Sequence, residues 1–398
     1  MLIVMKFGGS SLANEKMVEN AANIIINKSL GDNKIVAVVS AQGKTTDKLQ
    51  AESLAINSLP SQRENDVLLS SGEQISMSLI AMKICSMGYD AISLTGWQAG
   101  IHTNDSHGNS TINYIDTHRL LKELNSGKIV IVAGFQGIDD EQDITTLGRG
   151  GSDTTAIALS AALNADECLI YTDVDGVYSA NPQVVVNALK HQEISYEEML
   201  EMSTLGAKVL HNRCVLMAKQ NKVKFRVLSS LKSLSGTYVH DLTHNNAVTG
   251  VACDDNVSMI NIIGIESGDA ICKLFSVLAE KNIQVDVIIH SALSFVGVGV
   301  VRFSVSNNIS ETVAKLIEKN KDYIGFDKLI VEDNMAKISV IGLGMSDSCN
   351  IVSKMINALN KINIEAKYIT TGQIKISAII LKTNAPEAQK AIHKTFFE

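Results

Sequence analysis

The chain has 398 residues, of which 45% are hydrophobic and 19% are charged, and its formal net charge is −7. That length allows two or more domains, each with its own core. The negative charge argues against nucleic-acid or anionic-membrane partners, and no segment approaches the ~20 apolar residues of a membrane span. The six cysteines lack any CxxC or Cys/His metal spacing, so we expect free thiols, no metal site and a reducing, cytoplasmic location.

The first part of the chain alternates short apolar runs with helical patterns. Buried strands are predicted at 2–5, 35–39, 91–95, 129–133, 167–171 and 223–228. Helices are predicted at 14–28, 66–87, 114–125, 195–204 and 207–220. Alternating strands and helices with continuous apolar strands are typical of a mostly parallel sheet covered on both faces. We therefore predict an α/β domain over roughly the first 230 residues.

Two glycine-rich loops stand where phosphate chemistry would need them. KFGGSS at 6–11 follows the first strand, and GRGGSD at 148–153 opens a helix. Glycines let the backbone approach an anion, the helix start offers unpaired N–H groups, and Arg149 adds a planar fork for a carboxylate or phosphate. The alternative is an ordinary turn with Ser152 as N-cap. The acidic loop 172–178 follows the strand at 167–171, and carboxyl ends of parallel strands share one edge, which favours a ligand site.

Two other glycine motifs are incomplete nucleotide-binding signatures, and a third motif lies in a predicted helix. Gly43-Lys44-Thr45 ends like a P-loop, but position 38 is valine where the first glycine belongs. Gly342-Leu343-Gly344 lacks the third glycine of a dinucleotide fingerprint. The long helix at 66–87 should carry SSGE, 70–73, in its first turns. Glu73 is then either a buried ligand carboxylate, which we favour, or an ordinary first-turn acid.

The C-terminal part contains a repeat, preceded by a polar segment at 229–236. In one copy the loop after 262–264 leads to a helix at 270–281 and strands at 282–285 and 296–305. In the other, the loop after 340–342 leads to a helix at 350–361 and strands at 363–366 and 374–381. The pattern predicts two copies of a small α+β unit.

Several long motifs, in one order, resemble the monofunctional aspartate kinases of the amino-acid kinase family. They are KFGGSS at 6–11, VVSAQGKTTDKL at 38–49, SSGE at 70–73, LTGWQAGI at 94–101, GFQG at 134–137, TTLGRGGSDTTA at 145–156, TDVDGVYSANP at 172–182 and GAKVLH at 206–211. The repeat is similar to that family's paired ACT domains. The resemblance implies an amino-acid-kinase fold, with its mostly parallel sheet sandwiched between helices, plus two βαββαβ units. The expected divisions are a catalytic domain at 1–230, a linker at 231–247, one ACT domain at 258–330 and a second formed by 248–257 with 331–398.

The resemblance also implies an activity and a set of residues. The reaction transfers the γ-phosphoryl group of MgATP to the side-chain carboxylate of L-aspartate, which opens the lysine, threonine and methionine pathway. Lys6 and Asp153 are expected to be catalytic. The expected ATP-binding residues are Lys6, Phe7, Gly8, Gly9, Ser40, Thr172, Asp173, Tyr178, Gln183 and Lys208. The expected aspartate-binding residues are Thr46, Glu73, Arg149, Gly150, Gly151 and Ser152.

The ACT repeat implies feedback inhibition by lysine, threonine or both, with the effector at Ser267, Gly268, Asp269 and Asp286. The alternative is a dimerisation module without a ligand, and in either case we expect a homodimer or larger homo-oligomer.

The chain departs from the family pattern at four positions. Asn181 and Gln183 replace the usual aspartate and arginine, so ATP is expected to bind more weakly, whereas Gln42 and Asn212 replace a usual methionine and proline. Two other functions are compatible with parts of this sequence. One is a kinase of the same fold acting on glutamate, acetylglutamate, UMP or carbamate, and the other is a catalytically silent amino-acid sensor. SSGE, GRGGSD and the ACT repeat argue against the first, and retention of Lys6, Glu73, Arg149 and Asp153 argues against the second.

Overall fold

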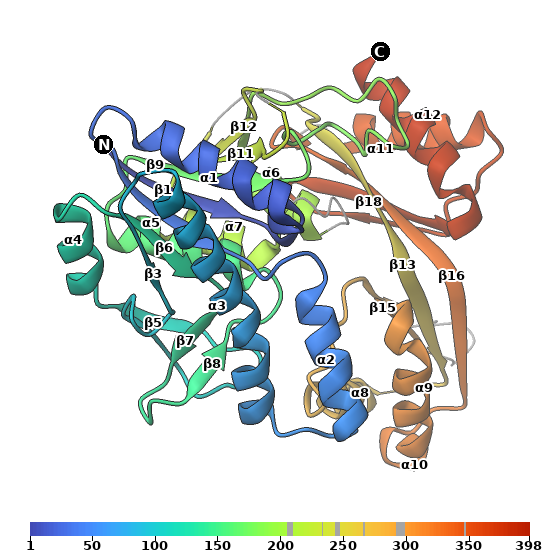
Figure 1. Ribbon diagram of the computed structural model, residues 1–398. Coiled ribbons are helices and arrows are strands. Elements are labelled where there is room, and N and C mark those ends of the chain that lie inside the picture. Colours follow the sequence, from blue (N-terminus) through green and yellow to red (C-terminus); the bar gives the residue numbers. More distant parts are fainter. Residues whose placement is uncertain (205–209, 233, 243–246, 266, 292–298, 346–347) are drawn as a thin grey trace. The chain divides into compact units, whose positions relative to one another are not determined.

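The computed structural model describes residues 1–204, 210–232, 234–242, 247–265, 267–291, 299–345 and 348–398 (Figure 1). The described residues form two compact units. The first unit comprises the described residues of 1–178, 190–204 and 210–242. The second unit comprises the described residues of 179–189 and 247–398. Residues Ser179–Leu189 thus belong to the second unit, although the first unit surrounds them in sequence.

An eight-stranded sheet forms the centre of the first unit, in the order β10-β12-β11-β9-β1-β2-β6-β3. Its neighbours are parallel except for β11 and β12. The strands are β1 Leu2–Phe7, β2 Lys34–Val39, β3 Ala91–Leu94, β6 Ile129–Ala133, β9 Glu167–Thr172, β10 Glu193–Ser195, β11 Phe225–Ser229 and β12 Thr237–His240. β1, β2 and β6 are buried along almost their whole length, which explains their continuous apolar sequence.

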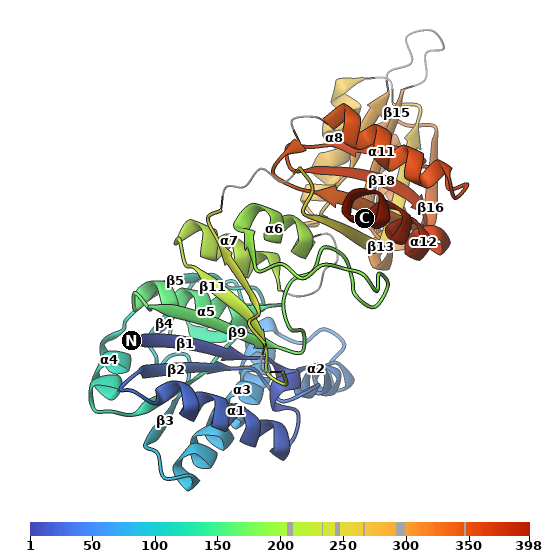
Figure 2. The same ribbon diagram turned by 90° about the horizontal axis from the view of Figure 1, so that it is seen from above.

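Helices cover both faces of this sheet, as Figure 2 shows for α1 and α3 on one side and α5 on the other. Met5, Ile25 and Ile80 belong to the core between β1, α1 and α3. The helices are α1 Glu15–Ser29, α2 Thr45–Ile56, α3 Gln62–Ser86, α4 His118–Asn125, α5 Gly151–Ala162, α6 Tyr196–Thr204 and α7 Asn212–Gln220. A small sheet, β5-β4-β7-β8, consists of β4 Ile101–Thr103, β5 Ile112–Ile115, β7 Gln136–Ile138 and β8 Ile144–Thr146. The predicted α/β class is confirmed.

The second unit is built on a six-stranded antiparallel sheet, β14-β15-β13-β16-β18-β17. Its two central strands have 14 residues each and pair with one another. The elements are β13 Gly250–Ile263, α8 Gly268–Ala279, β14 Ile288–Ser291, β15 Val300–Ser306, α9 Ser310–Lys319, α10 Lys321–Ile324, β16 Lys328–Ile341, α11 Ser348–Asn360, β17 Tyr368–Thr371, β18 Lys375–Leu381 and α12 Ala385–Phe397.

The second unit consists of two βαββαβ halves, and β13 and β16 are long enough to take part in both. Residues 257–263 of β13 pair with β15, whereas residues 335–341 of β16 pair with β18. The first half therefore contains α8, β14, β15 and α9, and its core includes Leu274 and Phe303. The second half contains α11, β17, β18 and α12, and its core includes Met355 and Ile392.

Several predicted boundaries were wrong. The helix expected from residue 66 begins at Gln62, so residues 70–73 lie in its third turn. The helix expected over 114–125 is strand β5 followed by α4, because Asp116 Oδ1 accepts a hydrogen bond from His118 N and ends the strand segment there. Of the helix expected at 207–220, the described part runs from Asn212. The expected linker at 231–247 contains β12, which joins the large sheet.

The predictions of strands at 282–285 and 363–366 are also wrong. Asn282 and Asn363 have left-handed backbone conformations, with φ of 51° and 56°. The N–H groups of Ile283 and Ile364 then bond back to the carbonyls of Leu278 and Leu359, which closes the preceding helix. The strands begin later, as β14 and β17. No helix in the described part of the chain is long and apolar enough to cross a bilayer.

Candidate active site

The carboxyl ends of neighbouring strands bring four motif loops to one edge of the large sheet. Gly8 N donates to Tyr171 O at 3.3 Å, Ser40 N to Phe7 O at 3.1 Å, and Gly134 N to Val39 O at 3.0 Å. The loops that follow β9, β1, β2 and β6 therefore start side by side, as expected for ligand sites in parallel sheets.

A cavity of about 670 Å³ opens beside these loops. Every residue predicted for catalysis or for aspartate binding lines it, and so do residues that were not predicted. The lining consists of Lys6, Thr46, Asp47, Gln50, Gln62, Asn65, Leu69, Glu73, Gly108, Phe135, Thr146, Gly148, Arg149, Gly150, Gly151, Ser152 and Asp153.

The N-terminus of α5 faces the cavity without a capping side chain. Gly150 is the N-cap, so the alternative in which Ser152 caps the helix is wrong. Gly150 has φ 71°, and a Cβ there would lie 2.3 Å from the Cβ of His211, so only glycine fits. The helix start carries unpaired N–H groups and a partial positive charge, which suit an anionic ligand.

Lys6 and Asp153 form an ion pair at the wall of the cavity. Lys6 Nζ lies 2.6 Å from Asp153 Oδ1, and both side chains are nearly buried. Lys6 comes from β1 and Asp153 from the first turn of α5, so two motifs far apart in sequence meet here. The contact fixes the ammonium group as a point charge beside the anion-binding helix start.

Glu73 presents a buried carboxyl group to the cavity and is only 3% exposed. Its Oε1 accepts a hydrogen bond from Ala41 N at 2.9 Å, and its Oε2 has no partner among the described residues. Burial raises the pKa of Glu73 to about 7. Gly72 makes this placement possible, because a Cβ there would lie 2.8 Å from the Cβ of Ala41. The first-turn alternative is excluded, and the free oxygen is suited to a cationic group.

Arg149 is an exposed cationic group on the cavity wall, and it forms no ion pair with any described residue. Arg213 differs, because its guanidinium donates to Leu147 O at 2.6 Å and to Ser110 O at 3.0 Å. Arg213 is therefore committed to holding the loops, whereas the planar fork of Arg149 remains available to a carboxylate.

Of the residues expected to bind nucleotide, Lys6, Phe7, Gly8, Gly9, Ser40, Thr172, Asp173 and Tyr178 belong to the strand ends and loops at this sheet edge, and only Lys6 among them lines the cavity. Phe7 stacks on Tyr171 with ring centroids 4.9 Å apart. In the loop after β9, Thr172 Oγ1 donates to Asp173 Oδ1 at 3.0 Å and Tyr178 OH donates to Asp175 Oδ1 at 2.9 Å. Gln183 belongs to the second unit and Lys208 lies outside the described residues.

Sequence reasoning missed the polar residues that α2 and the start of α3 bring to the cavity. Asn65 is buried and its Nδ2 donates to Gln50 Oε1 at 3.1 Å, while its Oδ1 has no partner among the described residues. α2 is only weakly amphipathic, so no periodic signal marked it. The neighbouring residue Asp66 is fully buried and accepts hydrogen bonds from Gly108 N and Thr146 N, which fixes the loop at the cavity rim.

One group in the described chain has the spacing of metal ligands, namely His107, Asp139 and Asp143. Arg63 already binds Asp143, with Nε donating to Oδ2 at 2.8 Å, and holds the pKa of that carboxyl below its usual range. Both carboxylate oxygens of Asp143 are thus already bound by the guanidinium of Arg63.

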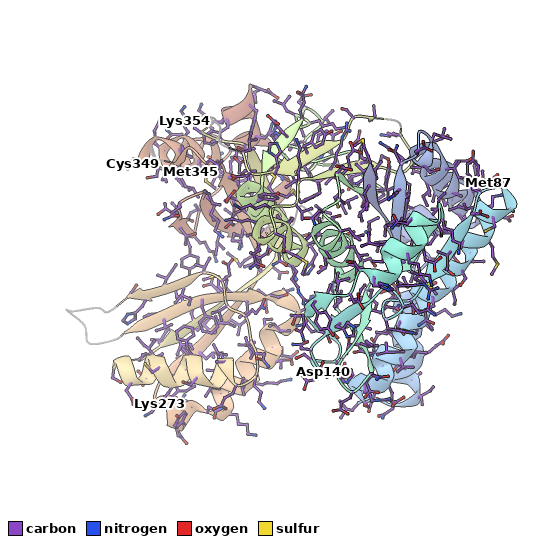
Figure 3. All side chains as sticks on the ribbon, turned by 90° about the vertical axis from the view of Figure 1, so that its left-hand side faces the viewer. Met87, Asp140, Lys273, Met345, Cys349 and Lys354 are labelled. Atoms are coloured by element: carbon purple, nitrogen blue, oxygen red, sulfur yellow. The ribbon has the colours of Figure 1, made fainter. Side chains whose placement is uncertain are left out.

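The expected effector residues lie in the first half of the second unit. Ser267 caps α8 by accepting a hydrogen bond from Ala270 N at 3.2 Å. Asp269 is exposed and pairs with Lys273, labelled in Figure 3, at 2.8 Å. Asp286 pairs with Lys337 of β16. Both acids therefore have cationic partners within the chain.

Comparison with known proteins shows the family to which each part of the chain is similar. Residues 1–229 match the amino acid kinase family, and residues 338–396 match an ACT domain. Aspartokinase 2 of Bacillus subtilis is 43% identical over 400 residues, covering 99% of this chain and 97% of the relative. The aspartokinase of Corynebacterium glutamicum is 40% identical over 404 residues, covering 99% and 96%. The chain belongs to the aspartokinase family of ATP-dependent kinases.

Solved structures agree with this assignment. Aspartokinase III of E. coli in complex with aspartate and ADP matches with a TM-score of 0.84 and 25% identity, over 100% of both chains. The same enzyme in complex with lysine and aspartate matches with a TM-score of 0.79 and 26% identity, again over 100% of both chains. The whole described architecture, including the ACT region, is thus shared with aspartate kinases.

Proposed function

We propose that this chain transfers the γ-phosphoryl group of MgATP to the side-chain carboxylate of L-aspartate, giving 4-phospho-L-aspartate and ADP. The observation that carries the proposal is the cavity in which Glu73, Arg149 and the Lys6–Asp153 pair surround the uncapped start of α5. Mg²⁺ enters as the counter-ion of ATP. Family membership supports the same reaction.

The charges of the cavity match the three charged groups of aspartate. The guanidinium of Arg149 is suited to the α-carboxylate, and the free oxygen of Glu73 to the ammonium group. With these two ends held, the side-chain carboxylate is the one left to meet the phosphate. Orientation of this kind lowers the barrier by making the reaction effectively intramolecular.

The nucleophile needs no general base. An aspartate side chain has a pKa of about 3.9 and is ionised at neutral pH. No histidine is present among the described residues that line the cavity, in keeping with this chemistry. Lys6 and the amides of Ser152 and Asp153, which follow the already paired Gly151 N in α5, stabilise the negative charge that spreads over the transferring phosphoryl oxygens.

The decisive assay measures ADP release from MgATP with and without L-aspartate. Release that requires aspartate, together with 4-phospho-L-aspartate trapped as its hydroxamate, is the expected result. Parallel reactions with glutamate, acetylglutamate, UMP and carbamate test the other substrates of the fold. Turnover with one of these and not with aspartate would contradict the proposal.

The role of Arg149 gives a specific prediction. Arg149→Ala should raise KM for aspartate by about 10- to 100-fold and leave KM for ATP within about twofold, because a charge-assisted hydrogen-bonded pair contributes about 1.5–3 kcal/mol. Steady-state kinetics with each substrate varied in turn would measure both constants. Arg119→Ala, on α4 outside the cavity, is the control. Equal increases in both KM values would contradict the assignment.

We also propose feedback inhibition by lysine, threonine or both through the first half of the second unit. Ser267, Gly268, Asp269 and Asp286 remain the candidate contacts, and an effector ammonium would compete with Lys273 and Lys337 for the two acids. The E. coli enzyme crystallised with lysine supports an amino-acid effector. The same assay with millimolar lysine, threonine or both tests this, and activity indifferent to every combination would contradict it.

A homodimer or larger homo-oligomer is part of the proposal. β14 and β17 are the two edges of the six-stranded sheet, so each has a strand partner on only one side among the described residues. Light scattering coupled to size exclusion would measure the mass, and a monomer at micromolar concentration would contradict this part. The six free cysteines fit a reducing compartment such as the cytosol.

A further inference from the structure

Residues Ser179–Leu189 connect the expected nucleotide loop to the second unit. This segment follows Tyr178 directly and belongs to the second unit, whereas 172–178 and 190–204 belong to the first. Its two ends pair with one another, because Ser179 N donates to Leu189 O at 2.8 Å, and the flanking residues of the first unit also pair, with His191 N donating to Val177 O at 2.9 Å. The chain therefore leaves the first unit at Tyr178 and returns to it at Lys190.

Ser179 is fully buried, and all of its polar groups are engaged. Its carbonyl oxygen accepts a hydrogen bond from Val251 N of β13 at 2.7 Å. Its Oγ accepts one from Leu189 N at 2.8 Å and lies 2.8 Å from His393 Nε2. The residue after the nucleotide loop is thus fixed to both a strand and a helix of the ACT region.

His393 is held just as firmly within α12. It is 1% exposed, and its ring stacks on Phe397 with centroids 4.6 Å apart. One turn earlier, Gln389 Nε2 donates to Val251 O at 3.0 Å, so α12 and β13 are joined beside Ser179. Burial lowers the pKa of His393, which keeps the imidazole neutral at physiological pH. A movement of α12 relative to β13 would have to change the Ser179–His393 contact.

The other end of the loop is fixed within the first unit. Val177 N donates to Thr237 Oγ1 of β12 at 2.9 Å. Tyr178 OH binds Asp175, and Lys190 Nζ lies 3.8 Å from the same carboxylate. Adjacent residues of one loop are therefore held by different units, and Tyr178 stands between the two anchors.

We propose that His393 is a positioning residue for the nucleotide. Its hydrogen bond to Ser179 sets the position of Tyr178 and Asp175, so that the arrangement of the ACT region is transmitted to ATP affinity along the covalent chain. The inference rests on the proposed function in taking 172–178 as part of the ATP site. It adds a route by which an amino-acid effector would act on nucleotide binding and not on the aspartate cavity.

Three variants separate this role from simple stabilisation. His393→Phe keeps a ring that can stack on Phe397 but removes Nε2, whereas His393→Gln keeps a polar group near that position. Ser179→Ala removes the contact from the other side. Asn187→Ala is the matched control, because Asn187 is an exposed residue of the same segment that bonds only to Glu398 among the described side chains.

The measurements are the Kd for MgADP by calorimetry, the KM values for ATP and aspartate, kcat, and the lysine or threonine concentration giving half-inhibition. His393→Phe and Ser179→Ala should each raise the Kd for MgADP and KM for ATP by about three- to tenfold, the range one hydrogen bond supports. The double variant should be no weaker than the single ones. KM for aspartate should stay within about twofold, and His393→Gln and Asn187→Ala should resemble the wild type.

Unchanged nucleotide constants in both His393→Phe and Ser179→Ala would overturn the proposal. So would equal increases in the constants for ATP and aspartate, additive effects in the double variant, or failure of His393→Gln to restore affinity. If the wild-type chain binds MgADP but shows no aspartate-dependent turnover, only the proposed reaction is contradicted. The MgADP measurement then still tests the role of His393. Thermal unfolding confirms that each variant is folded, and Ser179→Ala replaces His393→Phe if the latter is not.

Discussion

Glu73 gives the cavity a pH dependence that can be measured. Its pKa is raised to about 7 by burial, and it must be ionised to hold the ammonium group of aspartate. Below pH 7 the protonated form dominates, so KM for aspartate should rise by up to about tenfold per pH unit while KM for ATP changes little. KM measured between pH 5.5 and 8.5 tests this. In Glu73→Gln, KM for aspartate should be high throughout, and a wild-type KM that is flat below pH 7 would contradict the role.

The same carboxyl group affects folding stability. Its pKa is about 7 in the folded chain and near the ordinary 4.5 when unfolded, so between these values the folded state retains a proton that the unfolded state has lost. The contribution of Glu73 to the free energy of unfolding is therefore fully present below pH 4.5 and is lost as the pH rises through 7. Glu73→Gln should raise the free energy of unfolding by about 2–3 kcal/mol at pH 8 and by much less at pH 5.

Denaturant titrations at both pH values measure this difference. Glu141→Gln, at an exposed turn, is the matched control and should change stability equally little at each pH. Equal effects of Glu73→Gln at pH 5 and pH 8 would contradict the assignment of a raised pKa.

One departure from the family pattern, Asn212 in place of proline, lies at the start of α7. Asn212 is the first residue of the helix, where a proline is favourable because the N–H group there has no partner within the helix. His211 before it has φ −83° and ψ 140°, which a residue preceding proline adopts readily. Asn212→Pro should therefore stabilise the chain by about 0.4–1 kcal/mol through the unfolded state. Chemical denaturation measures it, and destabilisation by a similar amount would show that Asn212 makes a contact that proline cannot replace.

The central strands were the elements most readily predicted from sequence, for a physical reason. β1, β2 and β6 are covered on both faces, so they appear as unbroken apolar runs. β14 and β17 are short edge strands that are half exposed, so they give a weak signal. The apolar residues that precede them, Ile283 and Ile364, belong to the turns that end the preceding helices.

Some residues of the candidate site could likewise be predicted from the sequence, and others could not. Glycine loops and strand ends predicted where Lys6 and Arg149 would lie. The cavity-lining Gln50 comes from α2, which was not predicted, and Asn65 from the start of α3, which was predicted to begin at residue 66. Placing Tyr178 in one unit and Ser179 in the other required the three-dimensional contacts.

The Asp286–Lys337 pair contributes to the stability of the ACT region as a body. Lys337 is only 5% exposed, and its ion-pair partner is Asp286, whose side chain is half exposed. Asp286→Asn should destabilise the second unit by about 1–3 kcal/mol, less than a fully buried pair would lose, and adding Lys337→Met should recover most of the loss. Calorimetry should show the effect in the transition of the second unit, and a double variant as unstable as Asp286→Asn would contradict the pairing.

The placement of Ser179–Leu189 also has a consequence for biosynthesis. The ribosome releases the segment early, but its partners in β13 and α12 emerge only after the rest of the first unit and most of the ACT region. During translation the first unit can fold while this loop still lacks its anchor. We therefore expect nascent chains arrested before α12 to protect the β1 and β2 region from protease and yet to be cleaved within 179–189, with that cleavage lost once α12 has left the exit tunnel.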